Sequence, residues 1–104
     1  MKQERKFNER CYELLKKIPE GKVATYKEMA NALGSSAWRA VGSAMAKNIN
    51  LITIPCHRVV RSDGGIGQYA LGTDKKSELL VNEGVEVFKN KIANLDKYFF
   101  RFNA

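Results

Sequence analysis

A cysteine and a histidine stand next to each other near the middle of the chain, at Cys56 and His57. Apolar residues precede and follow this pair, a pattern typical of a buried β-strand. Pro55 lies directly before the pair, and because proline has no backbone N–H to donate to a sheet, the strand must break or bend there. A thiol and an imidazole at a break in a buried segment indicate a reactive site.

Four interpretations of Cys56 and His57 compete. A metal site is disfavoured, because adjacent side chains point apart and no second Cys or His pair exists to complete it. A structural role would bury an imidazole and the neighbouring arginine at a cost in desolvation. A direct hydrolase dyad needs unusual geometry, since neighbouring side chains of an extended strand diverge. As a nucleophile, Cys56 would pass its proton to His57 through a water or a bend, and a carboxylate elsewhere in the chain would orient the imidazole.

The composition describes a small basic protein. The chain has 104 residues, and we expect residues 1–104 to form one domain with its own hydrophobic core. Lys and Arg total 18 against 11 Asp and Glu, which gives a formal net charge of +7. This charge favours a polyanionic partner such as nucleic acid, although charge spread along a chain is equally typical of a well-solvated surface.

The sequence also bears on where the protein works. No stretch approaches the roughly 18 apolar residues of a membrane span, and the charged N-terminus is not a signal peptide. Cys11 and Cys56 have no metal-type spacing, which favours free thiols in a reducing compartment. We therefore expect a cytoplasmic (nucleoid-associated) or nuclear protein without membrane contact. Cys11 falls on the apolar side of a helix predicted over residues 5–17, where we expect a buried structural thiol.

Two further helices have the spacing of a helix-turn-helix. Thr25 and Glu28 form the pattern of a capping box at the start of the first, and Gly34 stands where that helix should end. Ser35 or Ser36 then caps a helix from about Ala37 to Lys47. Two helices joined by so short a turn are typical of DNA-binding proteins.

The second of these two helices has unlike sides. Trp38, Val41 and Met45 fall on one side and are predicted to face the core. The opposite side is small in the middle and cationic at its ends, and it holds Arg39, Ala40, Ser43, Ala46 and Lys47. Such a side can approach a groove of DNA closely, with Arg39 near the positive helix N-terminus. An alanine-rich surface chosen for helix propensity is an equal alternative.

The second half of the chain is predicted to mix helix and extended segments. A turn over 62–65 and a glycine-spaced loop over 66–72 lead to a helix from Thr73 or Asp74 to Glu83-Gly84, with Leu79 and Leu80 inward. Val85, Val87 and the aromatic stretch 98–102 are predicted to be extended and to close the core. The fold class we expect is α/β (α+β, mainly helical), a winged helix-turn-helix-like single domain with a small β element.

Five segments, in this order, resemble the O6-alkylguanine-DNA alkyltransferase family. They are the helix-turn-helix, Arg39-Ala40-Val41-Gly42, Pro55-Cys56-His57-Arg58-Val59, Gly67-Gln68-Tyr69 and Asn82-Glu83-Gly84. The resemblance implies a methylated-DNA–protein-cysteine methyltransferase that binds the minor groove of double-stranded DNA and flips an alkylated guanine. The alkyl group then moves irreversibly to the cysteine, so each molecule acts once. We expect no metal, no cofactor and a monomer.

The resemblance also implies a role for single residues. Cys56 is the alkyl acceptor, His57 the water-mediated base and Glu83 the carboxylate that completes the relay. Tyr26 assists guanine as the leaving group, so its hydroxyl must reach the pocket although its helical position faces the core. Arg39 enters the base stack in place of the flipped guanine, and the DNA-contacting set is Arg39, Ala40, Gly42, Ser43 and Lys47.

The remaining matches concern the pocket around the base. Asn48 ties the recognition helix to the active-site loop, and the backbone carbonyls of Cys56 and Val59 read the guanine amino group. Tyr69 and the amide of Ala70 form a wall. Leu71, where some relatives have glycine, narrows the range of bulky adducts. Lys76 matches a basic position of the family.

Two other functions stay open on the sequence alone. The length and the 85–102 tail resemble alkyltransferase-like proteins, which bind alkylated DNA without repairing it and usually have tryptophan or alanine in place of Cys56. Methyl transfer separates that damage sensor from a repair enzyme. The third possibility is a winged-helix transcription regulator that is indifferent to alkylation. Trp38 also departs from the family pattern, because smaller residues are frequent before the arginine. Its helical position places it toward the core, and the alternative is that it presses on a sugar or a base of the DNA.

Overall fold

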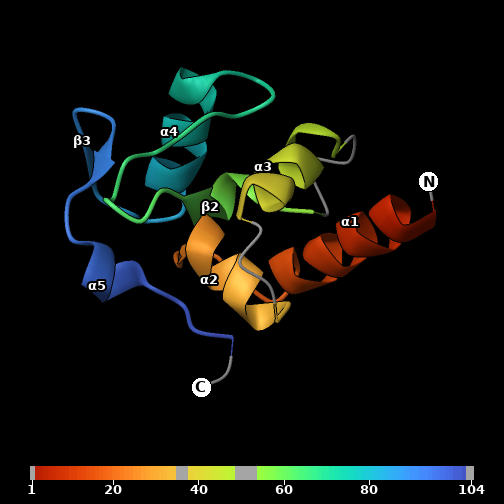
Figure 1. The fold of residues 1–104 in the computed structure, drawn as a ribbon. Coiled ribbons are helices and arrows are strands. Elements are labelled where there is room, and N and C mark those ends of the chain that lie inside the picture. The colour runs from red at the N-terminus through yellow and green to blue at the C-terminus, as the bar shows by residue number, and fades with distance from the viewer. Residues whose placement is uncertain (1, 35–37, 49–53, 103–104) are drawn as a thin grey trace.

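The computed structural model describes residues 2–34, 38–48 and 54–102, which form short helices and two small sheets (Figure 1). The helices are α1 (Lys2–Leu15), α2 (Tyr26–Ala32), α3 (Trp38–Ala46), the 3-10 helix η1 (Cys56–Arg58), α4 (Thr73–Asn82) and α5 (Leu95–Tyr98). The strands are β1 (Ala24–Thr25), β2 (Val59–Val60), β3 (Val87–Phe88) and β4 (Lys91–Ile92). The predicted fold class, mainly helical with a small β element, is confirmed.

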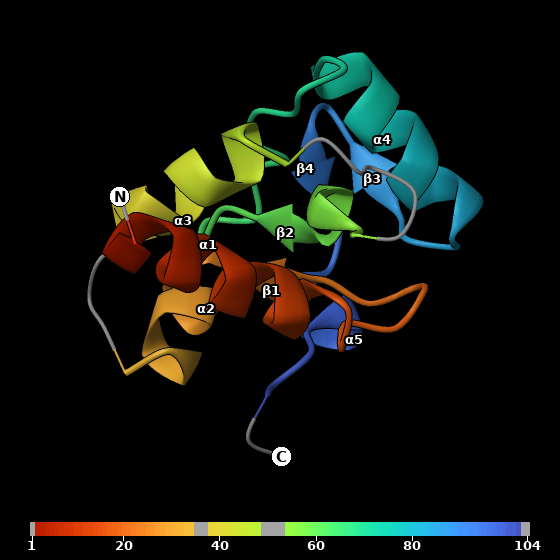
Figure 2. The same cartoon turned by 90° about the vertical axis from the view of Figure 1, so that its right-hand side faces the viewer.

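The parallel pair β1–β2 separates two groups of core residues. Figures 1 and 2 show α1, α2 and α3 on one side of this pair and α4 with the β3–β4 hairpin on the other. Successive residues of a strand point to opposite faces. Val59 accordingly packs in the core of the first three helices, whereas Val60 packs with Ile66 and Leu80 in the second group. The register Ala24↔Val59 and Thr25↔Val60 therefore fixes the position of η1, the turn directly before β2, relative to both groups of core residues.

The predicted start and end of α2 are confirmed. Thr25 is its N-cap, and the Thr25 side-chain oxygen accepts a hydrogen bond from the Glu28 amide at 3.0 Å. Gly34 follows the C-cap Leu33 with φ +71°, a conformation that glycine adopts without steric cost. The serines predicted to cap the next helix lie outside the described residues, as do residues 51–53 of the apolar run before Pro55.

The prediction that Trp38 faces the core is wrong. Val41 and Met45 are buried as expected, but Trp38 is 52% exposed. A helical side chain leans toward the helix N-terminus, so a residue in the first turn projects past the packed part of its helix. The helical-wheel argument assigns a side but ignores this displacement along the axis.

The C-terminal part is extended only in places. α4 ends at Asn82 with Glu83 as its C-cap, as predicted, and Phe99 bridges to Val23. The extended prediction is wrong for Tyr98, which ends the four-residue helix α5 and buries its side chain in the second group of core residues. Helical periodicity cannot be recognised in so short a helix.

One buried ion pair ties distant parts of the chain together. The Arg58 guanidinium donates from Nε to Glu83 Oε1 at 2.9 Å and from Nη2 to Glu83 Oε2 at 2.7 Å. Its third nitrogen, Nη1, donates to the carbonyl of Ile18 at 2.8 Å. The pair thus joins the segment after α1, the η1 turn and the end of α4. None of the helices in the described ranges has the length and apolar character that a bilayer crossing requires.

We predict that Arg58→Met lowers the free energy of unfolding by about 3 kcal/mol, because it leaves the largely buried Glu83 carboxylate without its cationic partner. Denaturant unfolding followed by circular dichroism measures this change. Arg61→Met is the matched control, since Arg61 pairs with Asp63 where both side chains are more than half exposed. Equal stability of the two variants would contradict the structural role of Arg58.

Candidate active site

Cys56 is the first residue of η1 and lies on the wall of a cavity. The break predicted at Pro55 takes the form of this 3-10 turn, after which the chain enters β2. Cys56 is only 5% exposed. Burial raises the pKa of its thiol, while a hydrogen bond from Asn48 and the positive charge of Lys76 act in the opposite direction. The thiol form therefore prevails in the resting protein, and a base is needed to remove its proton.

His57 is held by the carboxylate of Glu83. Its Nε2 lies 2.9 Å from Glu83 Oε2, and Arg58 fixes the same carboxylate from the other side. Burial works to raise the pKa of Glu83, but the hydrogen bonds and charges of Arg58 and His57 hold it below its usual value. Because an ionised carboxylate only accepts hydrogen bonds, Nε2 donates, and the lone pair of the neutral ring lies on Nδ1.

The free nitrogen of His57 is unpaired among the described residues. Nδ1 is buried and has no hydrogen-bond partner there. Burial lowers the pKa of His57, and the opposing effect of Glu83 does not restore it, so the imidazole is neutral near pH 7. A neutral imidazole with an unused acceptor, next in the chain to a thiol, is suited to take up a proton.

The cavity in front of Cys56 has a volume of about 1000 Å³. Tyr26 and residues of α3 form one side of it, and those of α3 are Trp38, Arg39, Gly42, Met45 and Ala46. The loop after β2 contributes Gly67, Gln68, Tyr69 and Ala70, and the tip of the β3–β4 hairpin contributes Lys89, Asn90 and Lys91. Four separate parts of the chain therefore meet around one thiol.

Not every residue predicted for the pocket lines this cavity. Tyr69 and Ala70 do, and the Tyr69 ring meets the His57 ring edge-on with centroids 6.4 Å apart. Asn48 lies behind the wall, where its Nδ2 donates to the carbonyl of Ile54 at 3.0 Å and so links the end of α3 to the segment before Cys56. Val59 is fully buried in the core, and Leu71 is 59% exposed away from the cavity.

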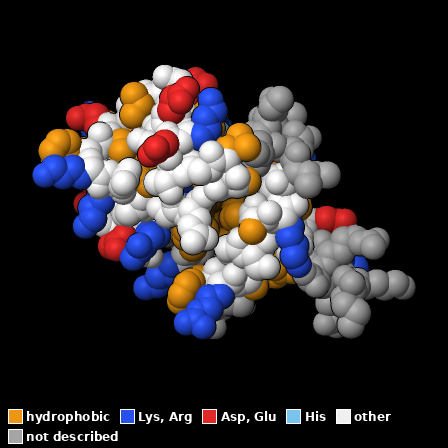
Figure 3. Space-filling view, turned by 90° about the horizontal axis from the view of Figure 1, so that it is seen from above, with side chains coloured by type: hydrophobic (Ala, Val, Ile, Leu, Met, Phe, Trp, Pro, Cys, Tyr) orange, Lys and Arg blue, Asp and Glu red, His pale blue; other side chains and the backbone are white. Residues whose placement is uncertain are grey.

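The residues predicted to contact DNA lie along one side of α3. Arg39 and Gly42 border the cavity, Ser43 and Lys47 are exposed, and Ala40 is half-buried. The residues in the middle of this exposed side of α3 have small side chains, as the sequence indicates. Figure 3 shows Lys and Arg side chains gathered at the lower left of one face of the molecule, with acidic side chains mainly above them.

Tyr26 reaches the cavity although its ring packs against the core. Its hydroxyl points toward Gly67, where an added Cβ would lie 3.4 Å from the Tyr26 Oη. Gly67 has φ +81°, so both its conformation and the close approach favour glycine. Burial raises the pKa of Tyr26, which keeps its hydroxyl protonated as a hydrogen-bond donor. A Tyr26 ring that packs against the core is therefore compatible with a hydroxyl that reaches the cavity.

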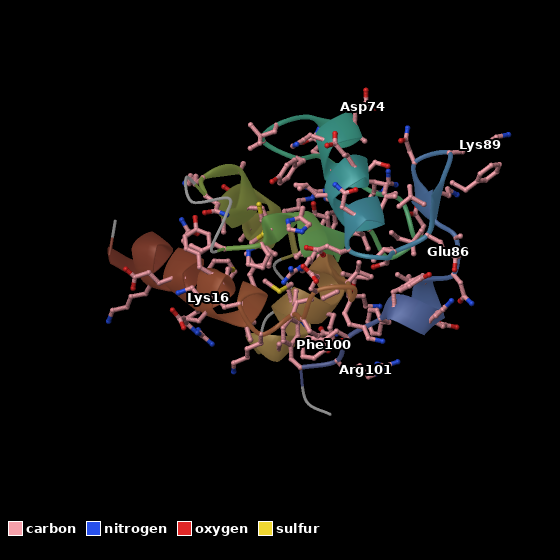
Figure 4. All side chains as sticks on the ribbon, turned by 180° about the vertical axis from the view of Figure 1, so that it is seen from behind. Lys16, Asp74, Glu86, Lys89, Phe100 and Arg101 are labelled. Carbon is pink, nitrogen blue, oxygen red and sulfur yellow. The ribbon has the colours of Figure 1, made fainter. Side chains whose placement is uncertain are left out.

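Sequence reasoning assigned no role to three contributors to the site. Lys76 is fully buried, its Nζ donates to the Gln68 carbonyl at 3.1 Å, and burial lowers its pKa to about 8. Arg58 belongs to the motif around Cys56 that resembles the family, but nothing near it in the sequence indicates that it hydrogen-bonds Glu83. The hairpin tip is the third, and Figure 4 shows Lys89 there, pointing away from the body of the protein. Of these three, only Lys76 was indicated by the sequence, because it matches a basic position of the family.

No group of His, Cys, Asp and Glu side chains in the described part of the chain is arranged to hold a metal ion. Cys56 and Cys11 are both buried, free thiols.

Comparison with known proteins identifies relatives among curated sequences. The chain is 45% identical over 93 residues to a bifunctional methyltransferase/endonuclease of Picrophilus torridus, covering 88% of this chain and 30% of that protein. It is 54% identical over 71 residues to the methylated-DNA--protein-cysteine methyltransferase of Saccharolobus solfataricus, covering 68% of this chain and 46% of that protein. The chain thus spans less than half the length of these curated relatives.

Solved structures that share the fold include those of two proteins from different organisms. S. pombe Atl1, in complex with damaged DNA containing O6-carboxymethylguanine, matches with a TM-score of 0.84 and 31% identity over 93% of this chain and 96% of that one. The O6-methylguanine-DNA methyltransferase of Pyrococcus kodakaraensis matches with a TM-score of 0.71 and 48% identity over 76% and 46%. The family model for the DNA-binding domain of 6-O-methylguanine DNA methyltransferase matches residues 6–85. The predicted resemblance is therefore confirmed, and the chain belongs to the 6-O-methylguanine DNA methyltransferase family.

Proposed function

We propose that this protein repairs O6-alkylguanine in double-stranded DNA by transferring the alkyl group irreversibly to Cys56. The observation that carries the proposal is the position of Cys56, on the wall of a cavity and next to an imidazole that Glu83 holds at 2.9 Å. We take residues 1–104 to act as one DNA-binding and active-site unit, without metal or cofactor and as a monomer. Because its proposed partner is double-stranded DNA, we place the protein in the cytoplasm at the nucleoid or in the nucleus.

The proposed reaction is a displacement at a saturated carbon. The Cys56 sulfur attacks the alkyl carbon, an S–C bond forms, and the bond between that carbon and guanine O6 breaks. The thiol proton passes through a bridging water to His57 Nδ1. The departing guanine takes up a proton from water and His57 returns its proton to water, so the net products are a thioether and guanine. The Tyr26 hydroxyl donates a hydrogen bond to the leaving base, and Glu83 stabilises the imidazolium that forms.

DNA binding follows from the shape and charge of α3. Its small exposed side enters the minor groove, with Ala40, Gly42, Ser43 and Lys47 along the contact and Arg39 inserted in place of the extruded guanine. Extrusion costs a few kcal/mol, which these contacts must offset. Tyr69, the amide of Ala70 and the carbonyls of Cys56 and Val59 then hold the base, with Asn48 bracing the wall. A net charge of +7 supplies affinity that does not depend on sequence.

A damage sensor that binds alkylguanine without accepting the alkyl group is the second candidate. The observation in its favour is that the match to S. pombe Atl1 covers 93% of this chain and 96% of that one. The presence of a thiol at position 56, beside a histidine and a carboxylate, favours transfer instead. Both candidates bind alkylated duplex, so the transfer reaction decides between them.

We predict that incubation with excess O6-methylguanine duplex adds one methyl group, on Cys56. Peptide mass spectrometry locates the added mass. Cys11→Ser should be methylated like the wild type, because Cys11 is fully buried and burial raises its pKa to about 11. Cys56→Ser should bind the same duplex and accept nothing. An unmodified Cys56 in wild-type protein that binds the duplex would support the sensor and exclude the repair function.

We predict that Glu83→Gln slows methyl transfer about 100-fold, the order of magnitude that a positioned base contributes. The change removes the carboxylate that supports positive charge on His57, so His57 becomes a weaker base. Quenched single-turnover measurements give the rate. Glu86→Gln is the control, because Glu86 is exposed and bonds Tyr98 away from the cavity.

The pH dependence of the same rate provides a further check. The folded pKa of His57 lies below its usual value of 6.5, so the wild-type rate should hold at pH 7 and fall as pH drops through that lowered pKa, where Nδ1 becomes protonated. In Glu83→Gln the fall should move to still lower pH. A rate independent of pH in the acidic range would argue against His57 as the base.

A further inference from the structure

We propose that Trp38 is a DNA-contacting residue whose indole packs against the nucleotide flanking the extruded guanine on the same strand. This inference rests on the proposed function, because it needs a guanine turned out of the duplex. It adds to α3 an aromatic contact beyond Arg39, Ala40, Gly42, Ser43 and Lys47, the DNA-contacting residues proposed above.

The first observation is the exposure of the indole. Trp38 is 52% exposed at the first turn of α3, on the same helix end as Arg39. A large aromatic side chain left in water at the mouth of a cavity gains free energy when a second surface covers it. Val81, on α4, has the same exposed fraction but borders neither of the cavities described here.

The second observation is that Trp38 lines two cavities, as do Tyr26, Arg61 and Asp63. One is the cavity that contains Cys56, and the other, of about 590 Å³, lies between α2 and the turn after β2. Lys27 and Asn31 of α2 line this second cavity on one side, and Arg61, Ser62 and Asp63 line it on the other. It therefore offers an aromatic face beside cationic and amide groups, and these suit the base, sugar and phosphate of a nucleotide.

The third observation is the contact between Trp38 and Arg39. The guanidinium carbon of Arg39 lies 5.2 Å from the centre of the indole, within the range of a cation–π interaction. One face of the ring thus restrains Arg39, the side chain proposed to enter the base stack. A nucleotide in the second cavity would meet the remaining exposed part of the ring, so one residue would position Arg39 and contact the strand beside the extruded base.

Charge favours DNA as the occupant. Lys27 and Arg61 flank the second cavity, and the single carboxylate there, Asp63, is already paired with Arg61 at 3.1 Å. Because Arg39 and the hairpin lysines border the neighbouring cavity, a polyanionic strand crossing from one cavity to the other would meet cations on both sides of Trp38.

Fluorescence tests the contact directly, because Trp38 is the only tryptophan of the chain. Titration of the Cys56→Ser protein with duplex containing one O6-methylguanine should quench the indole emission to a plateau. Unmodified duplex should quench it less at equal occupancy, since no guanine is extruded. Emission that does not change on binding alkylated duplex would overturn the proposal.

Affinity provides the second test. Trp38→Ala should bind alkylated duplex about tenfold more weakly, the fold-change for a loss of ~1.4 kcal/mol of stacking, and Trp38→Phe should recover most of it. Val81→Ala is the matched control and should bind like the wild type. Fluorescence anisotropy of labelled DNA gives the affinities, and thermal unfolding verifies that each variant is folded. Unchanged affinity of folded Trp38→Ala would refute the inference.

Transfer from the free base separates this inference from the proposed function. Free O6-methylguanine has no flanking nucleotide, so Trp38→Ala should lose a larger factor in transfer rate with subsaturating duplex than with the free base. If no methyl group is transferred in any variant but Trp38→Ala still weakens duplex binding, the repair function fails and the DNA contact of Trp38 stands. Equal transfer from duplex and equal affinity in both proteins would reject the Trp38 contact alone.

Discussion

The carboxylate of Glu83 is the group on which the rest of this structure depends. It accepts hydrogen bonds from the Arg58 guanidinium at 2.7 and 2.9 Å and faces His57 Nε2 at 2.9 Å. A carboxylate that is mostly buried is tolerated only when its charge is paired and its oxygens are hydrogen-bonded. Both partners come from the 3-10 turn that also carries Cys56, so one electrostatic requirement fixes the end of α4, the orientation of the imidazole and the place of the thiol.

Burial and charge act against each other throughout the site. Burial raises the pKa of Cys56 and lowers that of His57, so the neutral forms of both are favoured at rest. In the proposed proton transfer, Asn48 and Lys76 favour the Cys56 thiolate and Glu83 favours the His57 imidazolium, whereas the charge of Lys76 works against the imidazolium. In the resting protein this arrangement disfavours the reactive thiolate. In the proposed reaction it lowers the free-energy cost of forming the thiolate, because His57 can accept the thiol proton. The buried Lys76 also braces the cavity wall through the Gln68 carbonyl.

The small sheet explains why the cavity lies where it does. Two residues of β2, pointing to opposite faces, anchor separate core groups, and the turn before β2 is held between them. The β3–β4 hairpin attaches to the loop after β2 through the Ile66 amide and the Asn90 carbonyl at 2.9 Å and the Ile92 amide and the Gly64 carbonyl at 2.8 Å. The hairpin therefore extends the cavity wall with residues beyond the part of the chain that the family model matches.

The sequence by itself determined the helix-turn-helix, because Thr25 and Gly34 act through local backbone chemistry, and it singled out Cys56 and His57, because the backbone must break at Pro55. Similarity to a known family selected Glu83. Only the tertiary structure decided that Arg58 shares this carboxylate, that Trp38 lies outside the core, and that hairpin residues far along the chain border the cavity. Periodicity reports which side of an element a residue occupies, whereas position along the axis and contacts between distant segments depend on how the elements pack.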